Sequence, residues 1–97
     1  MNEIQVALSE YGRCFRANVG SVRMANGRYF STGLPRGFSD LFGVRHDGKA
    51  FFVEVKTETG RVSKDQQNFI RVMKELGALA GVARSVDDAI EIVQQEE

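Results

Sequence analysis

Phe51-Phe52-Val53-Glu54-Val55-Lys56 places a carboxylate and an ammonium inside a run of aromatic and β-branched residues. Such a run is typical of a largely buried β-strand. Side chains two positions apart point to the same face of a strand, so Phe52, Glu54 and Lys56 share one side. Burying charged groups costs several kcal/mol unless they are paired, hydrogen-bonded or bound to a metal, so the two charges require a structural explanation.

The chain has 97 residues, of which 42% are hydrophobic and 27% charged. This length and composition predict one globular domain over residues 1–97. No apolar run approaches the roughly 20 residues that cross a bilayer, and the amino end lacks the features of a signal peptide. We therefore expect a soluble, intracellular protein. The single cysteine, Cys14, excludes an intrachain disulfide and a cysteine-rich zinc site.

A formal net charge of zero conceals an uneven distribution of charge. Between Tyr11 and Ser39 there is no acidic residue, but there are five arginines: Arg13, Arg16, Arg23, Arg28 and Arg36. The planar guanidinium binds phosphate through paired hydrogen bonds, so this segment could contact an anionic polymer. A solvated loop that happens to lack acidic residues is an equally good interpretation.

Hydrophobic periodicity and turn residues predict the order α-β-β-β-α-β-α, a small mixed sheet flanked by helices. We expect helices over 2–11, over 63–76 with Phe69, Ile70, Met73 and Leu76 facing inward, and from Ser85 onward; the expected strands are 13–19, 39–45, 50–57 and 78–84. The glycine-rich segment 20–37 is too long for an idle connection and is a candidate substrate-contacting loop, with a short hairpin around Tyr29 and Phe30.

Asp47-Gly48 predicts a hairpin between the two central strands. A three-residue loop closing at Gly48 would place Asp40 opposite Glu54, whereas a two-residue turn would shift the register by one. Two adjacent carboxylates repel unless a proton or cation lies between them, and oxygen ligands suit Mg²⁺ or Mn²⁺. The structural alternative is that either carboxylate merely pairs with Lys56. His46 falls in the turn, at the far end of the strands from Asp40, which disfavours it as a base.

Two further side chains have both a structural and a catalytic interpretation. Gln66 continues the inward stripe of its helix, but Ser63-x-x-Gln66 also fits a capping box. Glu3 lies at the edge of the first apolar stripe, where it could reach inward or simply interact with the helix dipole.

The order of these residues resembles the PD-(D/E)XK nuclease superfamily and, more narrowly, the VRR-NUC family, whose stand-alone members are small and occur in phages and bacteria. The resemblance spans about residues 1–76 and rests on five features: Glu3, Asp40 in Gly-Phe-Ser-Asp, Glu54-Val55-Lys56, Gln66 after Arg61-Val62-Ser63, and Arg16-x-Asn18-x-Gly20. One position departs from the family pattern, because Ser39 stands where the family has proline.

The resemblance implies a restriction-endonuclease-like α/β fold with an αβββαβ core. Asp40 and Glu54 would ligate the divalent ion, Mg²⁺ or Mn²⁺, with the Val55 carbonyl. Lys56 would orient or activate the attacking water, and Glu3 and Gln66 would complete the catalytic set.

Stand-alone members of the family resemble Holliday-junction resolvases, which implies a DNA endonuclease acting on four-way junctions. Two symmetric cuts by a chain with one site imply a homodimer. DNA would be bound by the residues Arg13, Arg16, Asn18, Arg23, Arg28 and Arg36. The expected location is the cytoplasm of a bacterial or phage-infected cell. Open alternatives are flap, nicking or restriction-type cleavage, a non-catalytic DNA-binding module on the same fold, and a small protein-interaction module.

Overall fold

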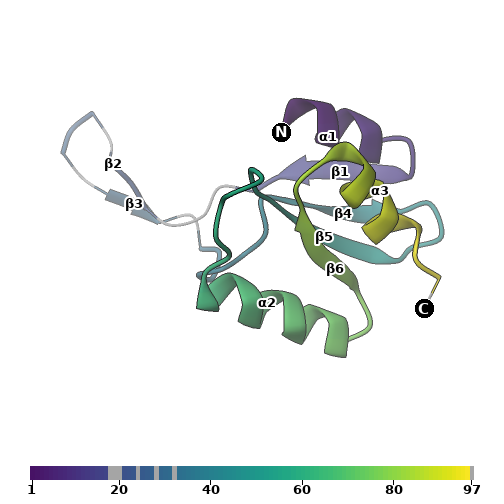
Figure 1. Ribbon diagram of the computed structural model, residues 1–97. Helices are drawn as coiled ribbons and strands as arrows, with labels where there is room; N and C mark the ends of the chain where they lie inside the picture. The colour runs from purple at the N-terminus through teal and green to yellow at the C-terminus, as the bar shows by residue number, and fades with distance from the viewer. Residues whose placement is uncertain (18–20, 24, 28, 32, 97) are drawn as a thin grey trace.

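A computed structural model describes residues 1–17, 21–23, 25–27, 29–31 and 33–96 (Figure 1). Three helices and six strands follow one another along the chain: α1 (Asn2–Leu8), β1 (Gly12–Arg16), β2 (Ser21–Arg23), β3 (Tyr29–Ser31), β4 (Leu41–Arg45), β5 (Ala50–Val55), α2 (Lys64–Glu75), β6 (Leu79–Ala83) and α3 (Val86–Gln94). The expected hairpin around Tyr29 is present as the antiparallel pair β2–β3. It projects away from the main sheet (Figure 1). None of the described helices is long and apolar enough to cross a membrane.

The main sheet has the strand order β1-β4-β5-β6. Its first three strands pair antiparallel, and β6 joins β5 in parallel after the chain has passed through α2. Helices α1 and α3 lie on one face of this sheet and α2 lies on the other (Figure 1). The predicted class, a small mixed sheet flanked by helices, is therefore confirmed, and it agrees with a restriction-endonuclease-like α/β fold.

The alternation of β5 divides its side chains between the two layers as the sequence predicts. Phe51 and Val53 are fully buried with Leu8, Leu41 and Val93, in the core between the sheet and α1 and α3. Phe52 faces α2 instead, where its ring centroid lies 5.4 Å from that of Phe69. One strand thus supplies the apolar core and, from its other face, the charged residues.

The segment before β4 is held tightly against the start of α2. Gly37 has φ +82°, and a Cβ atom built on it would lie 2.2 Å from the Asp65 carbonyl oxygen. This close approach requires glycine, because any side chain would collide with the helix backbone. The ring of the next residue, Phe38, packs against that of Phe69 with 4.9 Å between the ring centroids. Asp40 follows two residues after Phe38, so the packing of Gly37 and Phe38 against α2 helps to position its backbone.

Two details of the predicted helices are wrong. The first helix ends at Leu8, not at Tyr11, because the chain turns over residues 9–11 to let β1 pair with β4. Gly12 therefore begins a strand, and its Cβ would meet the Val44 carbonyl oxygen at 2.0 Å. Leu76 is 76% exposed and caps the carboxyl end of α2, outside the packed stripe that its spacing indicated.

Candidate active site

The β4–β5 hairpin adopts the register of the three-residue loop. The Arg45 amide donates to the Lys49 carbonyl at 2.9 Å, and the Gly48 amide donates to the Arg45 carbonyl at 2.9 Å. Gly48 has φ +88°, a conformation that glycine adopts without strain. Because Leu41 pairs with Val53, the residue before it lies beside Glu54. The predicted placement of Asp40 opposite Glu54 is confirmed.

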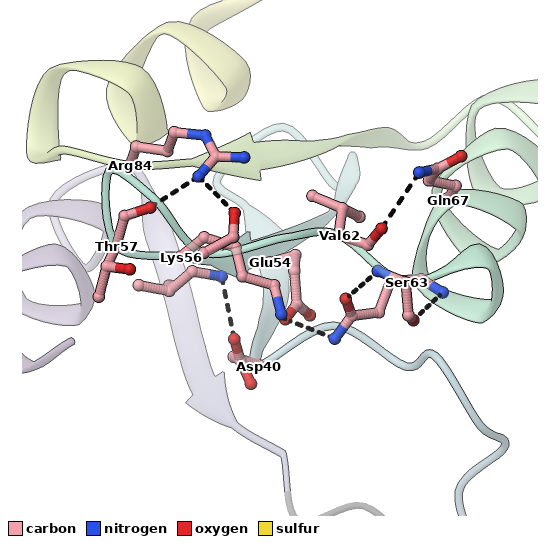
Figure 2. Close-up of polar contacts among 11 residues, drawn as sticks. Asp40, Glu54, Lys56, Thr57, Val62, Ser63, Gln67 and Arg84 are labelled. Carbon is pink, nitrogen blue, oxygen red and sulfur yellow. Dashed lines mark hydrogen bonds and ion pairs between the residues drawn. The ribbon is translucent and has the colours of Figure 1, made fainter.

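Asp40 is anchored by two backbone amides, and Figure 2 shows the hydrogen bond to its side chain. Its Oδ2 atom accepts a hydrogen bond from the Val55 amide at 2.9 Å, and its carbonyl oxygen accepts one from the Ala17 amide at 2.8 Å. The preceding residue, Ser39, is fully buried, and no described residue hydrogen-bonds its hydroxyl. The Val55 amide therefore holds the Asp40 carboxylate and the Ala17 amide holds its main chain, without a hydrogen bond from the Ser39 hydroxyl.

Glu54 is the buried member of the carboxylate pair, with only 3% of its side chain exposed. Its Oε2 atom accepts a hydrogen bond from Gln66 Nε2 at 2.9 Å and lies 3.5 Å from Lys56 Nζ. Its Oε1 atom is also buried, but no described residue hydrogen-bonds it. A buried carboxylate oxygen without a partner is costly, so this atom is available to a ligand that the protein itself does not supply.

The electrostatics of the pair lead to the same conclusion. Burial raises the pKa of Glu54 to about 7, the neighbouring Asp40 charge adds to the rise, and Lys56 offsets only part of it. Pairing with Lys56, the structural alternative for this carboxylate, therefore offsets only part of the cost of ionising Glu54. A proton or a cation between the two carboxylates would complete the compensation.

The all-oxygen donor set fits a hard divalent cation such as Mg²⁺ or Mn²⁺ better than a softer metal. The carboxylates of Asp40 and Glu54 interact with each other near the end of β5, where Val55 is the last residue. Within the described residues no group of three or more His, Cys, Asp or Glu side chains gathers around one point. Two carboxylates suit Mg²⁺, which keeps several water ligands in protein sites.

Gln66 forms the capping box and also contacts Glu54, through different atoms. Its Oε1 atom accepts a hydrogen bond from the Ser63 backbone amide at 2.9 Å, and the Gln66 backbone amide donates to Ser63 Oγ at 3.1 Å. These two bonds form the capping box of α2. Its Nε2 atom is left to hold Glu54. The start of α2 is thereby locked to the buried carboxylate (Figure 2).

Lys56 has 21% of its side chain exposed, so its amine lies between Glu54 and solvent. It also lines a cavity of about 330 Å³ with Glu3, Thr57, Arg84 and Ser85. The structure thus brings Glu3, on α1, to the same cavity as Lys56. Glu3 itself is exposed, and it approaches the lysine side of the site and not the Asp40–Glu54 pair.

The predicted DNA-binding residues divide into described and undescribed positions. Arg13, Arg16 and Arg36 are exposed, and Arg23 lies in β2. Asn18 and Arg28 lie outside the described residues. Alternation along β1 places Arg13 and Arg16 on opposite faces, and Arg16 pairs with Leu41, the residue after Asp40. Arg16 is therefore the nearer of the two to Asp40 along the sheet, but its side chain lies on the face of Leu41 and Val53, opposite to that of Glu54, whereas Arg13 lies on the face of Glu54.

Sequence reasoning missed Arg84. Its Nη1 atom donates to the carbonyl oxygens of Thr57 at 2.6 Å, Gly60 at 2.7 Å and Glu58 at 3.3 Å (Figure 2). These partners lie more than 20 residues away along the chain, so no local pattern predicted the contacts.

The two other candidate groups do not join the site. Burial raises the pKa of the Cys14 thiol to about 11, which disfavours a nucleophilic thiolate. His46 is exposed in the hairpin turn, where its Nε2 atom lies 3.3 Å from the Glu10 carbonyl oxygen.

A comparison with protein-family models matches residues 10–87 to the VRR-NUC domain. The matched segment contains Asp40, Glu54, Lys56 and Gln66 and continues into the start of α3, whereas Glu3 precedes it. No curated protein matches the chain.

Proposed function

The chain belongs to the VRR-NUC family of PD-(D/E)XK nucleases, and on that premise we propose that it is a divalent-metal-dependent endonuclease that resolves four-way DNA junctions as a homodimer. The observation that carries the proposal is the buried carboxylate of Glu54, which is paired with Asp40 and lies beside Lys56. No described residue hydrogen-bonds its Oε1 atom. This arrangement is expensive to maintain without a ligand, and a hard cation would relieve it.

Each residue of the proposed site has a distinct task. Asp40, Glu54 and the Val55 carbonyl would hold Mg²⁺ or Mn²⁺, which when bound would act as a Lewis acid and lower the pKa of its water. Gln66 keeps the Glu54 carboxylate in place. Lys56 directs its partly exposed ammonium toward the attacking water and the phosphate, where it offsets the growing negative charge. Glu3 contacts the same region from the far side of the Lys56 cavity.

The DNA would approach across the exposed arginines of β1 and of the segment before β4. Arg16 and Arg36 are suited to bind phosphates, which position a duplex without reading its sequence. A four-way junction needs two cuts related by a two-fold axis, which a homodimer provides. Phe15 and Val44, on adjacent strands, are 48% and 47% exposed and offer that dimer an apolar surface to bury.

The direct test is cleavage of a labelled four-way junction and of a linear duplex of the same sequence, with Mg²⁺, with Mn²⁺ and with EDTA. We expect paired, metal-dependent cuts in the junction. Asp40→Asn, Glu54→Gln and Lys56→Met should each lower the rate at least about 100-fold. Glu75→Gln, which alters an exposed carboxylate of α2, is the matched control and should cleave normally.

The outcomes separate the parts of the proposal. Equal cleavage of duplex and junction would remove the preference for branched DNA but leave the nuclease. DNA binding without any cleavage would favour a non-catalytic module. Sedimentation equilibrium tests the dimer independently, and a monomer at the concentrations that cut junctions would exclude it.

A further inference from the structure

Arg84 lies at the junction between β6 and α3 and is not among the residues assigned to the site above. Its guanidinium reaches across to the exposed turn 57–60, which begins directly after Lys56 (Figure 2). One nitrogen, Nη1, donates its two hydrogens to the Thr57 and Gly60 carbonyls at 2.6 and 2.7 Å, and the Glu58 carbonyl, at 3.3 Å, shares one of them. Hydrogen bonds from a charged donor are roughly twice as strong as neutral ones, so the turn is firmly attached.

The turn has few other attachments. Thr57, Glu58 and Thr59 are exposed, so apolar burial does not hold this segment. The Gly60 amide donates to the Thr57 carbonyl at 3.2 Å, closing the turn upon itself. Among the described residues, the contacts that tie the turn's carbonyls to the rest of the fold come from Arg84.

The position of the turn affects the lysine side chain. A Cβ atom built on Gly60 would lie 3.5 Å from Lys56 Cδ, so the turn backbone packs against the stem of the lysine. The Lys56 amide is itself fixed, since it donates to the Ala83 carbonyl at 3.0 Å. Movement of the turn would therefore change the direction of the side chain while the backbone of Lys56 stays in place.

Hydrogen bonds hold the backbone of Arg84 in place. Its amide donates to Asp88 Oδ2 at 2.9 Å, and the Asp88 amide donates to Ser85 Oγ at 3.1 Å, the capping bond of α3. The guanidinium thus extends from a capped helix start to the turn. Arg84, Thr57 and Lys56 also line the same cavity.

We propose that Arg84 is a positioning residue that holds the turn 57–60 and thereby aims the Lys56 ammonium at the reacting phosphate. The inference rests on the proposed nuclease function for its catalytic meaning. It concerns how the lysine is oriented, and it gives Arg84 no contact with the metal or with the DNA.

The test compares Arg84→Ala and Arg84→Lys with Arg71→Ala. Arg71 is an exposed arginine of α2 that pairs with Glu75, so its removal controls for the loss of a surface guanidinium. We expect Arg84→Ala to lower kcat about 10- to 100-fold, because small misplacements of catalytic groups have effects of this size, with KM for the junction within about twofold. Arg84→Lys should recover part of kcat, since an ammonium can still donate to the carbonyls.

Hydrogen–deuterium exchange gives a readout that does not require activity. Amides of residues 57–61 should exchange faster in Arg84→Ala, and those of β5 should not; Arg71→Ala should leave both unchanged. A raised KM and a smaller salt dependence with unchanged kcat would make Arg84 a phosphate contact and overturn the proposal. So would unchanged exchange in the turn. Wild-type protein that cuts no DNA would refute the nuclease function, while faster exchange would still show that Arg84 holds the turn.

Discussion

At the scale of single residues, the most consequential feature is that Glu54 is buried with one oxygen unpaired. Its neighbours, Gln66 and Lys56, both contact the other oxygen. Natural proteins rarely leave such an atom without a partner, and the exceptions concentrate at functional sites. The lone hydroxyl of Ser39 next to Asp40 is a second buried atom of this kind, at the position where the family has proline.

The stability of the metal-free protein should depend on the protonation of Glu54. Its pKa is about 7 in the folded state, against the usual 4.5. A carboxyl whose folded pKa is raised stabilises the fold fully below its unfolded pKa, and this contribution is lost as the pH rises toward 7. We expect the melting temperature in EDTA to fall by several degrees between pH 4.5 and 7.5, measured by calorimetry.

Glu54→Gln is the control for this prediction, because glutamine has the same shape and does not titrate. Its advantage over wild type in EDTA should grow across the same pH interval and level off above pH 7. Mg²⁺ should stabilise wild type at pH 8 and leave Glu54→Gln nearly unchanged. Identical pH profiles for the two proteins would mean that Glu54 is already compensated by its protein neighbours.

At the scale of the elements, the start of α2 contains both the capping box of the helix and the glutamine that contacts the proposed metal ligand Glu54. The capping box uses Ser63 and the Oε1 atom of Gln66, while Nε2 of the same glutamine binds Glu54. The helix cannot shift along its axis without moving the amide that holds the carboxylate. The capping pattern and the site pattern in the sequence were therefore one feature and not alternatives.

Substitutions at the two cap positions should separate these effects. Ser63→Ala removes a capping bond and should cost about 1 kcal/mol of unfolding free energy, while nuclease activity falls less than about threefold. Gln66→Ala should cost a similar amount and also lower kcat by at least about tenfold, because Glu54 loses its partner. Urea unfolding and junction cleavage measure the two quantities. Equal kinetic losses in both variants would show that only the integrity of the helix matters.

At the scale of the whole molecule, the two faces of the sheet differ: one carries the apolar core and the other the proposed site. The face under α1 and α3 carries the core around Phe51 and Leu41. The other face and the adjacent end of β5 carry the polar site, with α2 closing one side. The neighbouring strand β1 carries exposed arginines, although the formal net charge of the chain is zero. Binding to DNA would then depend on where the charges lie and not on their sum.

The proposed DNA contacts should be visible in the salt dependence of binding. Arg16→Ala and Arg36→Ala should each reduce the slope of log K against log salt by about 0.9, if each arginine neutralises one phosphate of duplex DNA. Fluorescence anisotropy with a catalytically inactive background such as Asp40→Asn measures this slope. Arg71→Ala, on the outer side of α2, should leave it unchanged. A slope that is insensitive to Arg16 and Arg36 would place the DNA on another surface.

By itself the sequence determined the elements and the pairing of the site strands. Asp47-Gly48 specified the hairpin, period-two alternation assigned the two faces of β5, and Ser63-x-x-Gln66 marked the start of α2. These are local preferences, which act over a few residues and can be recognised without knowledge of the fold. They left two registers for this hairpin, and the structure has the one that brings Asp40 opposite Glu54.

Only the tertiary structure decided the environment of those residues. The early end of α1 and the exposure of Leu76 followed from how the helices meet the sheet, which periodicity alone does not contain. The contacts of Arg84 join segments that are distant in the chain. The burial of Glu54 Oε1, which no described residue hydrogen-bonds, likewise depends on how distant segments pack around it. Burial and hydrogen bonding are properties of the space around an atom, so they exist only once the layers have packed.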